Sequence, residues 1–199
     1  SYTVNYLEKD TNKVLAKSKT VKSVFSAEVN EEALEITGYA YDEKTKSLIM
    51  KEKDNVINFY YTANSYNYTI EYYYDNNKDD SATFTEKAAF NSEIINYEDK
   101  SKTGYALSKV EGVPLKISED AAKNVIRVYY EREEYAYTIN YYYDGIKDDN
   151  ATIKATLKYA ESVNGYKDKI KTGYKLDKVT GLINGGLTIT EKPENNVIR

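Results

Sequence analysis

The chain has 199 residues, of which 23 are Tyr and none is Cys, His or Trp, and its formal net charge is -4 at pH 7. The absence of Cys excludes disulfides and thiolate metal sites, and the absence of His removes the commonest general base and transition-metal ligand. Nucleic-acid binding needs clustered Lys and Arg, which this acidic chain does not show. We therefore expect a protein that is not an enzyme, needs no cofactor and has no nucleic-acid partner.

No apolar run in the sequence approaches the roughly 20 residues that span a bilayer, so we expect no membrane contact in this segment. The richness in β-forming residues favours an all-β or an α+β fold. The first residues, SYTVNYL, and the last, NVIR, both fall inside strand patterns. The sequence therefore reads as a segment of something longer.

Three short markers recur in phase and indicate an internal repeat. A strand motif of the type YTVNYL or YTIEYY begins at Tyr2, Tyr68 and Tyr137; the triplet TGY begins at Thr37, Thr103 and Thr172; and NVI begins at Asn55, Asn124 and Asn196. The first two markers agree with each other, since both recur after 66 residues and then after 69. We predict three repeats, residues 1–65, 66–134 and 135–199, the third truncated in its last strand.

Each repeat begins with a predicted β-hairpin. In the second repeat, residues 68–74 (YTIEYYY) alternate between two faces, the Asp-rich and Asn-rich residues 75–80 form a loop, and residues 81–87 (SATFTEK) alternate again. The face with Tyr68, Ile70, Tyr72 and Tyr74 is predicted to be buried. The same interpretation places Tyr141 of the third repeat in the sheet core.

A short helix or turn is predicted after the hairpin. In the first repeat, residues 30–38 (NEEALEITG) offer Asn30 as a helix N-cap and Gly38 as a stop. Up to three more strands follow in each repeat. This order predicts an α+β, β-rich fold of three ubiquitin-like β-grasp modules in an elongated rod, with all-β sandwich modules as the alternative.

The tyrosine and aspartate clusters are the candidate binding residues. Tyr73 and Tyr142 lie on the other strand face, where exposed rings could stack on sugars. The weak candidate ligand contacts are Tyr73, Tyr142, Asp79, Asp80, Asp148 and Asp149. A calcium site at Asp75 and Asp144 is a weaker alternative, because the acids lack the alternate spacing of an EF-hand loop. The favoured interpretation of the aspartates is a solvated turn, and the TGY glycines are expected to adopt a positive φ angle.

The sequence resembles the mucin-binding-protein (MucBP) type repeat of surface proteins in Gram-positive Firmicutes. The resemblance lies in YTVNYLEKDTNKVLAKSKTV, ITGYAYD and NVINFYY of the first repeat, and in YTIEYYYDNNKDD, KTGYALSKVEGVPLKIS and NVIRVYY of the second. The chain departs from the family in having DTNK where DTGK is typical and an inserted NGG at residues 184–186. The family has no catalytic residue to carry over.

The resemblance implies a non-enzymatic, extracellular segment of a cell-wall-anchored bacterial surface protein. Its expected role is that of an adhesin stalk that also binds host mucin or another glycoprotein, and we expect it to be a monomer. A specific glycan-binding or immunoglobulin-binding module is the alternative. A glycan-processing enzyme, which would need a carboxylate pair in a cleft, is less favoured.

Overall fold

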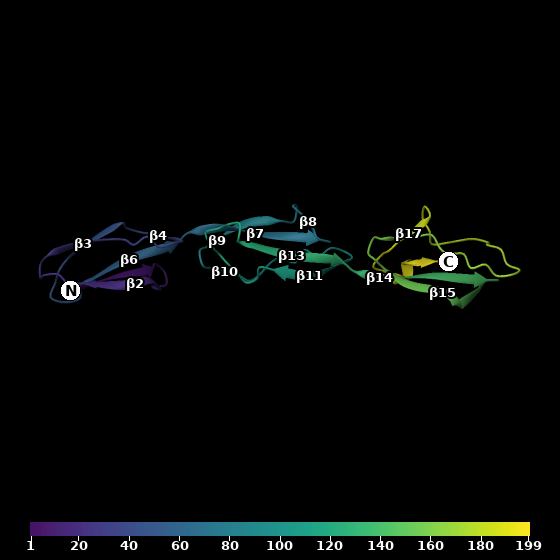
Figure 1. The fold of residues 1–199 in the computed structure, drawn as a ribbon, viewed down its shortest axis with the longest axis horizontal. Helices are drawn as coiled ribbons and strands as arrows, with labels where there is room; N and C mark the ends of the chain where they lie inside the picture. The colour runs from purple at the N-terminus through teal and green to yellow at the C-terminus, as the bar shows by residue number, and fades with distance from the viewer. The chain divides into compact units, whose positions relative to one another are not determined.

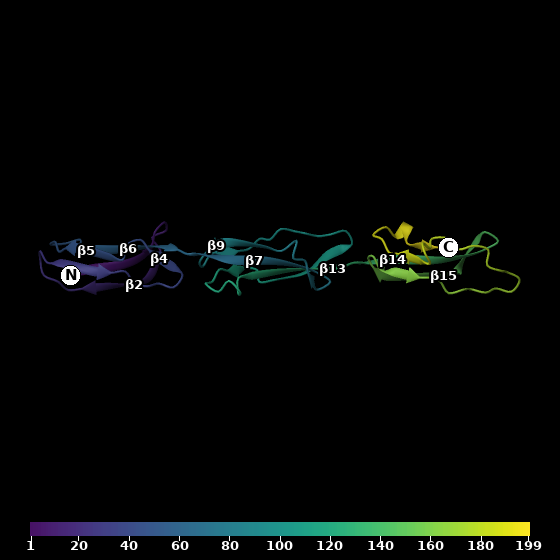
Figure 2. The ribbon, with the colours of Figure 1, turned by 90° about the horizontal axis from the view of Figure 1, so that it is seen from above.

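The computed structural model describes residues 1–199 and consists of 18 β-strands and one 3-10 helix (Figure 1 and Figure 2). The chain divides into two compact units, one formed by residues 1–70, 84–96 and 112–126 and the other by residues 71–83, 97–111 and 127–199. No helix in the chain has the length and apolar character needed to cross a membrane.

The first repeat contains a four-stranded sheet and a two-stranded ribbon. Its strands are β1 (Tyr2–Glu8), β2 (Val14–Val21), β3 (Glu28–Glu32), β4 (Tyr39–Tyr41), β5 (Thr45–Ile49) and β6 (Val56–Ala63). The sheet has the order β2-β1-β6-β4, in which β1 is antiparallel to β2 and parallel to β6, and β3 pairs with β5 in the ribbon. The sheet is therefore mixed.

The second and third repeats contain related sheets. Their elements are β7 (Ser65–Tyr74), β8 (Asn77–Lys78), β9 (Phe84–Ala89), β10 (Glu93–Ile94), β11 (Tyr105–Glu111), β12 (Leu115–Lys116), β13 (Val125–Arg132), β14 (Glu134–Tyr143), β15 (Ile146–Lys158), β16 (Ser162–Asn164), β17 (Gly186–Thr188), η1 (Pro193–Asn195) and β18 (Val197–Ile198). The larger sheets have the orders β11-β13-β7-β8, with β9 also beside β7, and β15-β14-β18. The ribbons are β10-β12 and β16-β17.

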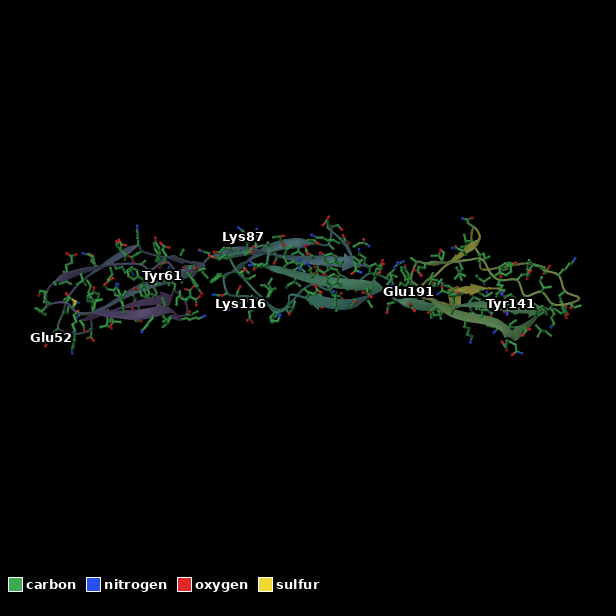
Figure 3. The ribbon with its side chains drawn as sticks, viewed as in Figure 1. Glu52, Tyr61, Lys87, Lys116, Tyr141 and Glu191 are labelled. Atoms are coloured by element: carbon green, nitrogen blue, oxygen red, sulfur yellow. The ribbon has the colours of Figure 1, made fainter.

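Each of the six sheets joins strands of one predicted repeat, except that β7 and β14 begin one residue before the predicted bounds, whereas the two compact units share the second repeat between them. The repeat bounds therefore stay a prediction. The alternation predicted for the opening strand of the second repeat is confirmed, because Tyr68, Ile70, Tyr72 and Tyr74 are all buried. Tyr61 of β6 is likewise fully buried in the first repeat (Figure 3). Tyrosine thus supplies much of the core in the first two repeats, as period-2 burial requires, whereas the buried core of the third repeat is aliphatic and Tyr141, predicted to lie in the core, is only half-buried.

The predicted helix is wrong. Residues 30–38 continue β3 and then run without regular structure, and the only helical element of the chain is the three-residue η1. The fold is therefore all-β, and the predicted α+β class with ubiquitin-like β-grasp modules is corrected. The all-β class, which was the alternative, is the one that fits.

Tyrosine hydroxyls form hydrogen bonds with the segments that follow β3 and β10, and this explains why these segments stay extended. Tyr61 Oη donates to the carbonyl of Leu34 at 2.9 Å and accepts from the Leu34 amide at 3.0 Å. In the second repeat, Tyr72 Oη donates to the Glu98 carbonyl at 2.7 Å. An extended segment has no internal hydrogen bonds, so its buried backbone groups need partners from outside. The hydroxyl groups of tyrosines in the sheet supply these hydrogen bonds, and this favours an extended segment over a helix.

Candidate functional site

Tyr73 is held by its neighbours within the second repeat. Its ring is half-buried and stacks on Tyr129 with 4.8 Å between the ring centroids, and its hydroxyl donates to Glu71 Oε2 at 3.0 Å. Tyr142, the equivalent residue of the third repeat, is 44% exposed. Of the two candidate tyrosines, Tyr142 is therefore the more exposed.

Glu71, which the sequence did not single out, is the centre of the polar contacts around Tyr73. It accepts from Lys78 Nζ at 2.9 Å and from Arg127 Nε at 3.0 Å. Burial raises the pKa of Glu71, but hydrogen bonds from Lys78 and Tyr73 outweigh this effect and the net shift is downward. The third repeat has Asn140 at this place, so the charge network is not repeated.

Asp75 and Asp144 form tight turns. Asp75 and Asn76 have φ angles of 49° and 64°, and Asp144 and Gly145 have 52° and 78°. Positive φ at both central residues is the mark of the two-residue hairpin turn that follows the twist of the strands. The carboxylate of Asp75 is also occupied, because Oδ2 accepts from Arg132 Nε at 2.6 Å and Oδ1 from the Arg132 amide at 3.1 Å.

Asp79 and Asp148 cap the turns that follow. Asp79 Oδ1 accepts from the amides of Ser81 and Ala82, and Asp148 Oδ1 accepts from those of Asn150 and Ala151. Asp79 also pairs with Lys102 at 2.7 Å. These two side chains serve the backbone, as the turn interpretation predicts.

Asp80 and Asp149 point to solvent, with side chains that are 89% and 84% exposed. They pair with Lys78 at 3.7 Å and with Lys147 at 2.8 Å. In no part of the chain do three or more acidic side chains gather in a way that could hold a metal ion. The acids therefore do not converge on one site.

The asparagine of each NVI marker is buried, and in the second and third repeats its side chain acts as a clip, a role that sequence reasoning missed. Asn124 is fully buried, and its side chain accepts from the Ser118 amide and hydroxyl and donates to the carbonyls of Ser118 and Asn67. Asn196 makes the same set of contacts with Thr190 and Ala136. The clip ties the residues before the last strand to the first strand. A polar residue repeated at the start of an apolar strand was the available signal.

The glycine of the first TGY marker holds an aromatic ring from the second repeat. Gly38 has a φ of +79°, and the ring of Phe90 covers its Cα. Phe90 also makes edge contacts with Tyr39 and Tyr66, with ring centroids 5.7 Å and 6.1 Å apart. The predicted positive φ is confirmed, and the close approach of a ring gives a second reason for glycine at this place.

The second marker repeats this arrangement. Gly104 has a φ of +77° and is covered by the ring of Tyr159, which comes from the third repeat. Gly173, the third of the series, has a φ of +82° and no atom near its Cβ position. Phe25 precedes a positive-φ residue, as Phe90 and Tyr159 do, and is 73% exposed. We call a glycine together with the ring that covers it, Gly38 with Phe90 or Gly104 with Tyr159, an aromatic lock.

Backbone hydrogen bonds complete each lock through the single residue that separates the strands. Asn64 lies between β6 and β7; its amide donates to the Gly38 carbonyl at 2.9 Å, and its carbonyl accepts from the Phe90 amide at 2.8 Å. Glu133 lies between β13 and β14 and makes the same two bonds, with Gly104 and Tyr159, both at 2.9 Å. In each of these one-residue linkers, both the amide and the carbonyl are therefore hydrogen-bonded.

Comparison with known proteins gives no family. No protein-family model matches the chain, and a search of curated proteins finds no match either. The resemblance to mucin-binding-protein repeats therefore stays a prediction from the quoted motifs.

Proposed function

We propose that the chain is a non-enzymatic spacer, the tandem-repeat stalk of an extracellular, cell-wall-anchored bacterial surface protein. The observation that carries the spacer role is the aromatic lock, which is built twice from equivalent residues. The bacterial and extracellular setting rests on the resemblance to mucin-binding-protein repeats.

The lock suits a spacer because it removes freedom where a repeat chain would otherwise bend. A linker of one residue whose amide and carbonyl are both hydrogen-bonded cannot rotate freely about φ and ψ without breaking a bond. The half-buried ring adds apolar contact on the same side, so bending must also expose more aromatic surface to water. Nothing in this arrangement requires a ligand.

Distances between spin labels test the lock directly. The chain has no Cys, so a single pair can be introduced at exposed positions on either side of Asn64, for example Lys17→Cys in β2 and Lys116→Cys in β12. Pulsed electron paramagnetic resonance should give a narrow distance distribution in the parent chain. In a Phe90→Ala background the distribution should broaden.

Phe25→Ala is the matched control, because Phe25 has the equivalent place in the first repeat but is 73% exposed. It should leave the distribution unchanged. A distribution in the parent chain as broad as in Phe90→Ala would overturn the spacer proposal. Antibody labelling of intact bacterial cells that carry the protein tests the surface location separately.

Binding of host mucin glycoprotein is a second candidate function, and the exposed ring of Tyr142 favours it. On a glycan array, binding through this ring should be lost in Tyr142→Ala and kept in Tyr73→Ala, since Tyr73 is stacked on Tyr129. An array without binding, or binding that survives Tyr142→Ala, contradicts this candidate and leaves the spacer role untouched.

A further inference from the structure

The first and last strands of the first repeat lie side by side and run in the same direction. Six residues of β1 pair in unbroken parallel register with six residues of β6. One end of the pair is closed by the Thr3 amide, which donates to the Asn55 carbonyl at 2.9 Å, and the other by the Lys9 amide, which donates to the Tyr61 carbonyl at 2.9 Å. The two strands are therefore bonded to each other from end to end.

The second repeat joins its first and last strands in the same way. β7 and β13 are neighbours in its sheet, and the amides of Thr69 and Asp75 donate to the carbonyls of Asn124 and Tyr130 at 2.9 Å and 3.0 Å. The two donors are six residues apart, as are the two acceptors and the corresponding residues of the first repeat. Such equal advance along both strands is the pattern of a parallel pair.

Tension along the chain loads these pairs lengthwise. One residue, Asn64, separates β6 from β7, and one residue, Glu133, separates β13 from β14. A pull along the chain therefore reaches the second repeat at the start of β7 and leaves it at the end of β13. Because the strands are parallel, these two points lie at opposite ends of the pair, and the pull slides one strand along the other. The evenly spaced bonds between the strands are then strained together and not one after another.

Side chains add cross-links to the pair in the second repeat. Three hydrogen bonds connect β7 and its turn with β13 and the residue before it: Asn124 Nδ2 to the Asn67 carbonyl at 3.1 Å, Arg127 Nε to Glu71 Oε2 at 3.0 Å, and Arg132 Nε to Asp75 Oδ2 at 2.6 Å. In the first repeat, Asn5 Nδ2 donates to Asn58 Oδ1 at 2.9 Å, whereas the side chain of Asn55 bonds to Lys51. The cross-links of the second repeat include two that are charge-assisted, which are the stronger kind.

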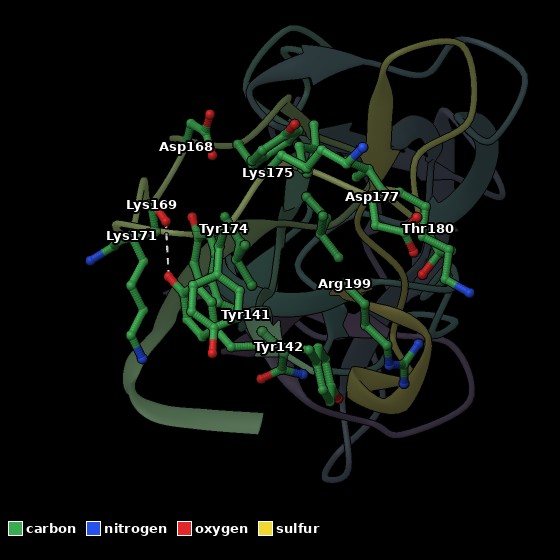
Figure 4. Close-up of a pocket in the computed structure, with 18 of the residues that line it drawn as sticks. Tyr141, Tyr142, Asp168, Lys169, Lys171, Tyr174, Lys175, Asp177, Thr180 and Arg199 are labelled. Atoms are coloured by element: carbon green, nitrogen blue, oxygen red, sulfur yellow. Dashed lines mark hydrogen bonds between the residues drawn. The ribbon is translucent and has the colours of Figure 1, made fainter. Parts of the chain in front are cut away.

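We propose that the paired strands of the first two repeats, β1 with β6 and β7 with β13, are force-bearing clamps that keep each repeat folded while the chain is pulled lengthwise. The third repeat is not included, because β14 pairs with β18 at Thr138 and Ile139 and a groove of about 870 Å³ lies beside residues 140–145 (Figure 4). The clamp is a property of each repeat, but its use in the cell rests on the proposed spacer function, since a tethered spacer is pulled at both ends.

The direction of pulling tests the clamp while its strands stay unaltered. The chain has no Cys, so pairs of Cys at exposed residues can serve as attachment points for single-molecule force spectroscopy on the whole chain. Ser1→Cys with Thr62→Cys pulls β1 and β6 from opposite ends of the pair. Asp10→Cys with Thr62→Cys pulls them from the same end, because these two residues follow the bonded residues Lys9 and Tyr61.

The unfolding force should be at least about twofold higher when the strands are pulled from opposite ends, because the evenly spaced bonds then share the load. When the strands are pulled from the same end, the bonds break one at a time. Equal forces for the two arrangements, or a higher force for the second, would overturn the proposal.

A side-chain variant tests the clamp of the second repeat, with Ser65→Cys and Glu131→Cys as the exposed attachment points. Arg127→Gln should raise the rate of unfolding at constant force about threefold or more, because its charge-assisted bond to Glu71 lies across the clamp and breaks in the unfolding step. An unchanged rate in Arg127→Gln would contradict the role given to this cross-link.

Lys102→Gln is the matched control in the same repeat. Lys102 pairs with Asp79 at 2.7 Å, but neither residue belongs to β7 or β13. Lys102→Gln should therefore leave the unfolding rate under force unchanged. An effect as large as that of Arg127→Gln would mean that general stability sets the unfolding force, and would refute the clamp.

Failure of the clamp and failure of the spacer proposal are distinguishable. A narrow distance distribution between the spin labels, together with equal unfolding forces in the two pulling directions, would keep the spacer and refute the clamp. A broad distribution together with the higher force for pulling from opposite ends would do the reverse.

Discussion

The ring of Phe90 occupies the space that a β-carbon on Gly38 would need, with Cδ1 of the ring 2.3 Å from that position. Tyr159 stands in the same relation to Gly104, with Cγ at 2.1 Å. Atoms this close would overlap, so a side chain at either glycine must displace the ring. The glycine of the TGY triplet thus allows the turn within one repeat and also the close contact with a ring from the next repeat.

This relationship predicts a graded response to alanine along the glycine series. Gly173→Ala should cost about 1 kcal/mol, the strain of a positive φ in a residue with a Cβ. Gly38→Ala and Gly104→Ala should cost about 2–4 kcal/mol, because displacement of the ring adds to the strain. Urea titration measures the free energy of unfolding of each variant.

A Phe90→Ala background separates the two contributions. Without the ring, Gly38→Ala should cost no more than Gly173→Ala, as a double-mutant cycle will show. Equal costs at all three glycines in the parent chain would mean that the rings yield without penalty, contrary to the prediction.

The buried asparagines predict a second graded series. Asn124→Ala should destabilise the chain by about 2–4 kcal/mol, because partly buried backbone groups of Ser118 and Asn67 lose hydrogen bonds to a fully buried side chain. Asn55→Ala should cost less, about 1–2 kcal/mol, since the bonds of Asn55 are to the amide and carbonyl of Lys51 alone. Thermal or urea unfolding of the two variants gives the comparison, and the reverse order would contradict it.

The aspartate turns predict loss of stability in acid. Burial raises the pKa of Asp75, but the hydrogen bonds and charge of Arg132 outweigh it and lower the pKa below the usual value. The hydrogen bond from Lys102 likewise lowers the pKa of Asp79. Carboxylates with a lowered pKa in the folded state stabilise it above the unfolded pKa of about 3.9, and this stability is lost as the pH falls through the folded value.

Asp75→Asn should therefore lower stability at neutral pH and flatten its decline in acid. Unfolding midpoints in urea, measured across the acid range, give the profile. Asp80→Asn, at a side chain that is 89% exposed, is the control and should keep the profile of the parent chain. A profile for Asp75→Asn as steep as that of the parent chain would count against the role given to Arg132.

The buried phenols predict loss of stability in alkali. Burial, followed by the charge of Glu98, raises the pKa of Tyr72 to about 12. A group with a raised folded pKa stabilises the fold below its unfolded pKa of about 10, and this contribution is lost as the pH rises through about 12. Tyr72→Phe should make stability less dependent on pH in this window, as urea midpoints would show. An unchanged dependence would assign the loss to other tyrosines.

The sequence predicted the elements whose residues contact their own strand or turn. The alternation of Tyr68, Ile70, Tyr72 and Tyr74 and the positive φ of Gly38 follow from local rules, because period-2 burial and the tolerance of glycine need no distant partner. The turn role of Asp79 follows for the same reason.

The remaining features depend on residues far apart in the chain. Residues 30–38 are held extended by partners far along the chain, because residues 30–32 pair with β5 and the hydroxyl of Tyr61 bonds both backbone groups of Leu34. The stacking of Tyr73 on Tyr129 likewise joins residues far apart in the chain. Local propensity by itself favoured the helix, and the contacts across the sheet decided against it.

By itself, then, the sequence determined the buried tyrosine face of the second repeat and the turns, because each depends on neighbours along the chain. Only the tertiary structure decided the all-β class and the aromatic locks. These depend on which side chains meet across long separations, such as Gly38 with Phe90, and no local pattern encodes such a meeting.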